Sequence, residues 1–133
     1  MSSTEYNITP GRYEKQLPVS TKVHFKSSAN STNATLVKGS SGTVFNMIIH
    51  NTATAGVGND CHFRLYNLDR LPVVGTDVPM AVIQLSSGSS KEVNFTSGIT
   101  FTNGIAYSMT AGDNLLDATA VSADAVQLYM GYM

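Results

Sequence analysis

Residues 43–51, TVFNMIIHN, decide the fold class, because their side chains alternate at the period of two that is typical of a β-strand. On one side of this expected strand lie Phe45, Met47 and Ile49. Val44 and Ile48 lie on the other side. Apolar side chains on both sides are typical of a strand that lies between two neighbours. We therefore expect residues 43–51 to run through the middle of a sheet.

The same alternation recurs on either side of this stretch and predicts eight to nine strands in all, joined by short turns. An Asn103-Gly104 pair between two of them favours a type I′ turn and therefore a hairpin. The side chains expected to face inward are Val23 and Phe25; Ala34 and Leu36; Cys61, Phe63 and Leu65; Ala81, Ile83 and Leu85; Val93 and Phe95; Ile99 and Phe101; Ile105, Tyr107 and Met109; and Val126, Leu128 and Met130.

Composition agrees with an all-β fold. The 133 residues include 15 Ser, 14 Thr and 10 Asn, which favour turns and strand surfaces over helix interiors, and only 13% are charged. No ten-residue stretch follows the helical period of 3.6, and no strand–helix–strand spacing is present. The expected architecture is a two-sheet antiparallel β-sandwich, either jelly-roll-like or of another Greek-key type.

Residues 1–20 lack this alternation and contain two prolines, so they are expected to form an extended arm ahead of a single β-sandwich domain, residues 21–133. The arm nevertheless carries apolar and basic side chains, which a purely solvated tail has little reason to hold. We expect it to contact a partner through Tyr6, Ile8, Arg12, Tyr13, Lys15 and Leu17.

The chain offers little chemistry, so we expect no enzyme, no cofactor and no metal site. His24, His50 and His62 do not have metal-ligand spacing, and adjacent residues such as Cys61 and His62 point to opposite faces of a strand. The aspartates near the last loop match no calcium-binding pattern and are expected to hold turns instead; they are Asp113, Asp117 and Asp124.

Charge and targeting signals also limit the expected partners. The net charge is −1 and the pI is about 6.2, which disfavours a nucleic-acid partner, although residues 1–38 are basic and residues 60–133 acidic. The first residues hold no apolar segment, so we expect no secretory leader, and no apolar run approaches the ~20 residues of a membrane span. With a single cysteine, these features predict a protein made in the host cytoplasm that has no membrane partner.

Residues 63–85, FRLYNLDRLPVVGTDVPMAVIQL, and residues 92–133, which begin EVNFTSGITF, resemble small structural proteins of tailed bacteriophages. The least generic pieces are Gly75-Thr76-Asp77 and Gly98-Ile99-Thr100-Phe101, and the similarity covers roughly the last 70 residues. The resemblance implies a virion component, of which the first candidate is a head decoration or cement protein on the capsid exterior. Tail or adaptor components of the same β type are also compatible with it, and no catalytic residues are implied.

We therefore expect a non-enzymatic capsid decoration protein that stabilises the lattice of the major capsid protein and assembles as a homo-oligomer, with a trimer favoured. The alternative is a tail or tail-fibre component, or a carbohydrate- or receptor-binding sandwich. That alternative requires exposed aromatic side chains in a shallow groove, for which the candidates are Tyr66, Tyr107, Tyr129 and Tyr132.

Overall fold

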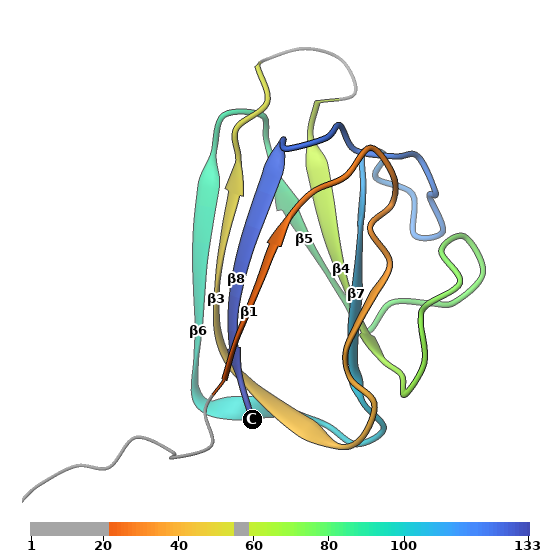
Figure 1. Ribbon diagram of the computed structural model, residues 1–133. Helices are drawn as coiled ribbons and strands as arrows, with labels where there is room; N and C mark the ends of the chain where they lie inside the picture. Colours follow the sequence, from red (N-terminus) through yellow and green to blue (C-terminus); the bar gives the residue numbers. More distant parts are fainter. Residues whose placement is uncertain (1–21, 55–58) are drawn as a thin grey trace, which may run out of the picture.

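A computed structural model describes residues 22–54 and 59–133, and every regular element in these two ranges is a β-strand (Figure 1). The strands are β1 (Lys22–Ser27), β2 (Thr35–Lys38), β3 (Gly42–Asn51), β4 (Cys61–Asn67), β5 (Ala81–Leu85), β6 (Ser90–Phe101), β7 (Ile105–Thr110) and β8 (Val126–Tyr132).

These strands form two four-stranded antiparallel sheets, in the orders β1-β8-β3-β6 and β2-β7-β4-β5. The sheets face each other as the two layers of a sandwich (Figure 1). Strand β1 pairs with β8, β2 with β7, β3 with β6 and β4 with β5, which is the strand pairing of a jelly roll. The all-β sandwich expected from the sequence is confirmed, and β3 lies inside its sheet as predicted.

The core lies between the two sheets and is filled by the alternate side chains of their inner faces. On β4, β5, β7 and β8 the inward sets are those that the alternation predicts. Fully or almost fully buried members include Met47, Ile49, Cys61, Phe63, Leu65, Leu85, Tyr107, Met109, Leu128 and Met130.

The pairing of β3 with β6 contains a large bulge that the alternation does not reveal. Val44 pairs with Ile99 and Asn46 pairs with Asn94, so residues 95–98 of β6 lie opposite the single residue Phe45. Gly98 adopts a φ of 78° in this bulge. The extra residues bend β6, and Phe45 is itself an extra residue where β3 pairs with β8, because Val44 pairs with Tyr132 and Asn46 with Gly131. The alternation of β3 shifts at this point, so Val44 is buried although the sequence places it on the side opposite Met47 and Ile49.

Strand β1 faces the opposite way from the prediction. Val23 and Phe25 are 70% and 51% exposed on the outer face, whereas His24 points inward. The Nε2 atom of His24 lies 2.7 Å from the hydroxyl oxygen of Tyr107 in the other sheet, and the two rings pack edge to face. Burial, together with the charge of Lys26, lowers the pKa of His24, which favours the neutral ring in this contact.

The predicted hairpin at Asn103-Gly104 is wrong. Neither residue has a positive φ, and β6 and β7 belong to different sheets, so residues 102–104 cross from one layer to the other. The side chain of Asn67 holds this crossing by accepting hydrogen bonds from the backbone N–H groups of Asn103 (2.8 Å) and Gly104 (3.4 Å).

Substituting Gly104 should destabilise the fold. A Cβ atom at this position would overlap the carbonyl oxygen of Leu68 and lie 2.7 Å from that of Lys38, and neither backbone atom can move aside cheaply. We expect Gly104→Ala to lower the free energy of unfolding by about 1–3 kcal/mol in urea denaturation. Gly39→Ala is the control, because its Cβ would meet Leu36 at an ordinary 3.6 Å. Equal stability of the two variants would contradict the close approach.

Candidate interaction surface

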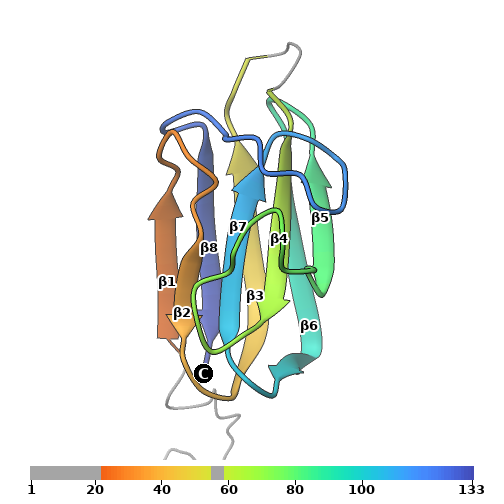
Figure 2. The same cartoon turned by 90° about the vertical axis from the view of Figure 1, so that its right-hand side faces the viewer.

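The outer face of the β2-β7-β4-β5 sheet is covered by two long loops. In Figure 2 the loops of residues 68–80 and 111–120 pass in front of β7 and β4. All six residues of β7 and the first six of β4 are buried, although half of them point away from the core. The second layer of cover explains why polar residues such as Arg64 and Ser108 are inaccessible on an outward-facing surface.

Arg64 fastens the 111–120 loop to the sheet. Arg64 is 1% exposed, and its guanidinium group donates hydrogen bonds to the carbonyl oxygens of Leu115 (2.6 Å), Asn114 (2.8 Å) and Gly112 (3.1 Å). Its Nε–H group bonds the hydroxyl of Thr110 at 2.8 Å. The rigid, forked shape of arginine allows one side chain to bond several backbone carbonyls at once.

Asp117 closes the same loop from the inside. Its carboxylate accepts hydrogen bonds from the backbone N–H groups of Gly112 (3.0 Å) and Thr119 (3.0 Å), and from the Thr119 hydroxyl (2.9 Å). Burial raises the pKa of Asp117, but these hydrogen bonds and the charge of Arg64 outweigh it and hold the pKa below its usual value. The structural role expected for this aspartate is confirmed.

The 68–80 loop is held by its own ion pair. Arg70 meets Asp77 through two parallel contacts of 2.7 and 2.9 Å, and Asp77 also accepts the backbone N–H of Val73 at 2.7 Å. The hydrogen bond from Arg70, followed by that from Val73, lowers the pKa of Asp77 to about 2. Pro72 and Pro79 are buried and anchor the two ends of the loop.

These two ordered loops expose six large apolar side chains, which we call the loop surface: Leu71, Val73, Val78, Met80, Leu115 and Leu116. The sequence predicts that Leu71 and Val73 pack within their loop, but they are 57% and 54% exposed. The loops touch at Gly75, where a Cβ atom would lie 3.5 Å from the Cβ of Ala118 and 3.8 Å from the carbonyl oxygen of Leu116.

Exposed apolar side chains on a fixed backbone favour protein association. Apolar surface supplies the driving force, and a backbone that is already ordered loses little conformational entropy when a partner binds. The alternation of side chains along strands does not predict such a surface, because the residues of this surface lie in loops. The sequence signal that could indicate this surface is that leucines and valines occur close to turn-forming aspartates in residues 68–80 and 113–117.

His62 also lies on the covered outer face and is 5% exposed. Neither of its ring nitrogens has a hydrogen-bond partner among the residues that the structure describes, and nothing in those residues explains this. Cys61, its neighbour, points to the opposite face into the core, as the sequence predicts, and burial raises its pKa to about 12. The thiol is therefore protonated and unreactive at neutral pH.

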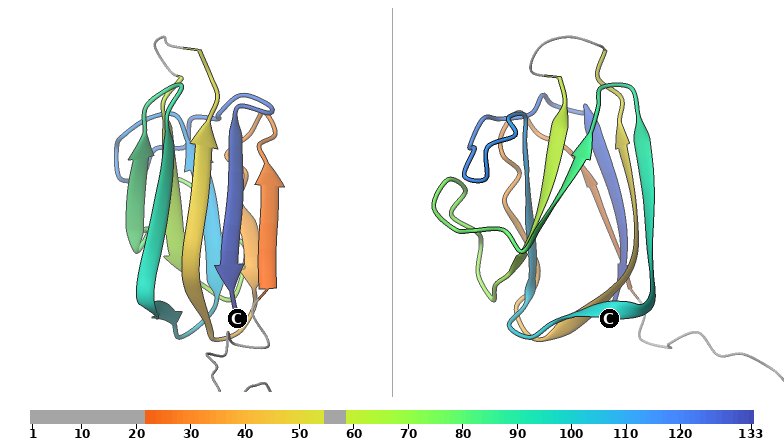
Figure 3. Two further views of the ribbon diagram at one scale, coloured as in Figure 1. Left: turned by 90° about the vertical axis from the view of Figure 1, so that its left-hand side faces the viewer. Right: turned by 180° about the vertical axis from the view of Figure 1, so that it is seen from behind.

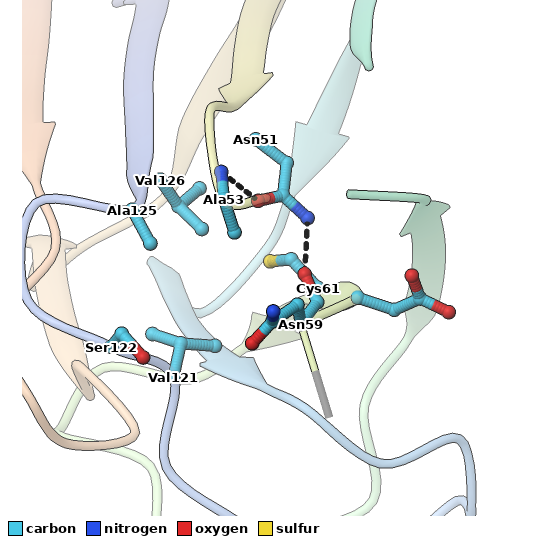
Figure 4. Close-up of a pocket in the computed structure, with 9 residues that line it drawn as sticks. Asn51, Ala53, Asn59, Cys61, Val121, Ser122, Ala125 and Val126 are labelled. Atoms are coloured by element: carbon cyan, nitrogen blue, oxygen red, sulfur yellow. Dashed lines mark hydrogen bonds between the residues drawn. The ribbon is translucent and has the colours of Figure 1, made fainter. Parts of the chain in front are cut away.

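A cavity beside Cys61 is too small for a substrate. Figure 4 shows its lining, where Asn51 accepts a hydrogen bond from the Ala53 N–H (3.2 Å) and donates one to the Asn59 carbonyl oxygen (2.9 Å). The volume of about 10 Å³ is roughly that needed for one water molecule. Within residues 22–54 and 59–133, no three His, Cys, Asp or Glu side chains come together as metal ligands.

The residues predicted to contact a partner lie outside the described ranges, so their positions stay a prediction: Tyr6, Ile8, Arg12, Tyr13, Lys15 and Leu17. Of the four tyrosines considered for ligand binding, Tyr66 and Tyr107 are buried, and only Tyr129 is exposed, at 43%. No helix able to cross a membrane occurs in the described part of the chain.

Comparison with known proteins gives only remote similarities. The chain matches no family model. It also matches no curated protein sequence. Among solved structures, it is similar to the coat protein of Tobacco streak virus, with 15% identity, a TM-score of 0.40, and coverage of 90% of this chain and 89% of that chain. A dimer of the same coat protein gives 11% identity, a TM-score of 0.39, and coverage of 90% and 88%. A similarity at this level carries no information about function.

Replacing Arg64 should release the 111–120 loop. Arg64→Met keeps much of the side-chain volume but leaves three loop carbonyls without their donor, so we expect a loss of about 3 kcal/mol in the free energy of unfolding. Amide hydrogen exchange should speed up in residues 111–119 more than in β8.

Arg70→Met is the control, because it removes an exposed guanidinium and should have a smaller effect on stability. Exchange in residues 111–119 that matches the unmodified protein would show that Arg64 does not hold the loop.

Proposed function

We propose that this chain is a non-enzymatic structural protein of a virion, which binds other protein subunits through its loop surface. The observation that carries the proposal is the set of six exposed apolar side chains on two loops that Arg64, Asp117 and the Arg70–Asp77 pair hold in place. Solvent exposure of so many large apolar groups is costly unless a partner covers them.

The finer assignment is a decoration or cement protein that stabilises the lattice of the major capsid protein of a tailed phage. It rests on the resemblance of residues 63–133 to small virion proteins of these phages. The loops belong to the resembling part, since Val73 to Asp77 and Leu115 to Asp117 both lie within it. A decoration protein repeated on a shell, as a trimer in our proposal, gains affinity from many modest contacts.

Charged substitutions on the loop surface should abolish capsid binding. Leu115→Asp with Leu116→Asp places two carboxylates in the contact, while the backbone carbonyls that Arg64 binds are retained. We expect at least tenfold weaker co-sedimentation with empty capsid shells, which corresponds to about 1.4 kcal/mol or more.

The matched control for this experiment is Val23→Asp, which alters a 70% exposed apolar side chain on the other sheet and should leave binding unchanged. The proposal fails if the double variant sediments with shells as well as the unmodified protein does.

A second candidate function is binding of a carbohydrate on the outer face of the β1-β8-β3-β6 sheet. Phe25 of β1 pairs in register with Tyr129 of β8, their ring centroids are 4.8 Å apart, and both rings are about half exposed. Asn46 and Gln127 lie on flanking rows of the sheet and supply polar groups. An exposed aromatic pair beside amide side chains is suited to sugar rings, which have an apolar face and a hydroxyl rim.

A glycan array separates the two functions. If the second candidate is correct, the unmodified protein binds defined glycans and Tyr129→Ala loses that binding, whereas Leu116→Asp does not. Absence of binding to every glycan on the array, with shell binding retained, would remove the carbohydrate function and leave the structural one.

A further inference from the structure

One side of the sandwich is open. Strands β5 and β6, each at the edge of its sheet, lie together at the turn of residues 86–89 and diverge away from it (Figure 3, right). Between them is a groove of about 420 Å³, which we call the edge groove. Seven of its nine lining residues are apolar, and they include Leu65, Ala81, Ile83, Val93, Phe95 and Ile99.

The edge groove continues into the hydrophobic core. Leu65, which is 1% exposed, is one of its lining residues, whereas Ile83 and Phe95 pack against the core but are only partly buried. On the opposite side of the sandwich, His24 of β1 reaches Tyr107 and joins the two sheets. The groove therefore leaves apolar surface in contact with water, and removal of such surface from water favours an apolar occupant.

The size of the edge groove suits a small, elongated molecule. Its volume lies within the range of about 300–1,000 Å³ that is typical of small-molecule sites, which are mostly apolar and hold a few polar groups. Along β6 the lining extends from Lys91 to Phe95, and four residues of a strand cover about 13 Å.

Lys91 places a positive charge at one end of the groove. It is the only charged residue among those that line the groove within the described ranges, and its neighbour Glu92 points to the opposite face of β6. The Lys91 ammonium group donates a hydrogen bond of 3.2 Å to the neutral carbonyl oxygen of Gln84. A carboxylate is the complementary partner for this ammonium group, because a hydrogen bond between two ionised groups is stronger than one to a neutral carbonyl.

Two features of the groove disfavour a polypeptide strand as its occupant. Residues 95–98 of β6 form the bulge opposite Phe45, so they do not offer the regular spacing of a strand edge. On β5, Lys91 covers the backbone carbonyl of Gln84. Bulges and lysines at sheet edges are known to oppose pairing with a further strand.

We propose that the edge groove binds a fatty acid, with the alkyl chain against Ile83, Val93 and Phe95 and the carboxylate paired with Lys91. The bound chain removes the open side of the core from water and stabilises the folded protein by mass action. The site is separate from the loop surface, so this proposal is independent of the function proposed above.

Methyl NMR of the unmodified chain tests the location of the site through its six isoleucines. Lauric acid, added below the concentration at which it forms micelles, should shift the methyl signals of Ile83 and Ile99, which line the groove, by more than a linewidth. The signals of Ile48 on the outer face and Ile105 deep in the core should not move. Unchanged Ile83 and Ile99 signals would overturn the proposal, and so would an equal shift of Ile48.

A substitution in the groove tests the contact with the alkyl chain. Ile83→Gln replaces apolar lining with an amide, so we expect at least tenfold weaker binding of lauric acid in calorimetric titration. Ile48→Gln is the matched control, because it makes the same change on the outer face of the other sheet and should leave the affinity unchanged. Equal affinities of the two variants would contradict binding in the groove.

The role of the carboxylate is tested with dodecanol, an uncharged molecule that has the same chain length as lauric acid. Lys91→Gln should weaken the binding of lauric acid about threefold to fivefold, as expected for a partly exposed ion pair, and should leave the binding of dodecanol unchanged. Lys22→Gln on β1 is the control and should alter neither affinity. If Lys91→Gln binds lauric acid as tightly as the unmodified protein does, the carboxylate does not pair with Lys91 and the proposal fails.

Discussion

The buried guanidinium group of Arg64 is the interaction on which the candidate surface depends. A charge removed from water is unfavourable unless hydrogen bonds replace its hydration. Here four acceptors, three of them backbone carbonyls of one loop, replace it. Asp117, whose pKa the Arg64 charge helps to lower, bonds the same loop from its other side. The loop that carries Leu115 and Leu116 is thus ordered by polar contacts and free to present apolar side chains.

The jelly-roll winding explains why the molecule has two unlike sides. Pairing of first with last strand and of second with seventh places β1 and β2 at one side of the sandwich and β5 and β6 at the other. On the first side His24 joins the sheets, while on the second the strands diverge and leave an apolar groove between β5 and β6.

Much of the fold follows from side-chain alternation, since burial of one face of a sheet requires apolar residues at every second position. The alternation correctly predicts the inward residues of β4, β5 and β8. It fails for β1, where Val23 and Phe25 are the apolar set but His24 finds a specific partner in Tyr107, 83 residues away. It also fails at Val44, because Phe45 is an extra residue in the pairing of β3 with β8 and lies opposite the bulge of β6.

The sequence by itself determined that the chain forms a two-layer antiparallel sandwich, because period-two alternation and turn residues are local properties. It also determined that Cys61 and His62 face apart, since neighbours on a strand always do. Only the tertiary structure decided which strands pair, that Asn103-Gly104 crosses between sheets, and that two distant loops meet over Arg64. These features depend on contacts between residues far apart in the chain, for which a single sequence carries no periodic signal.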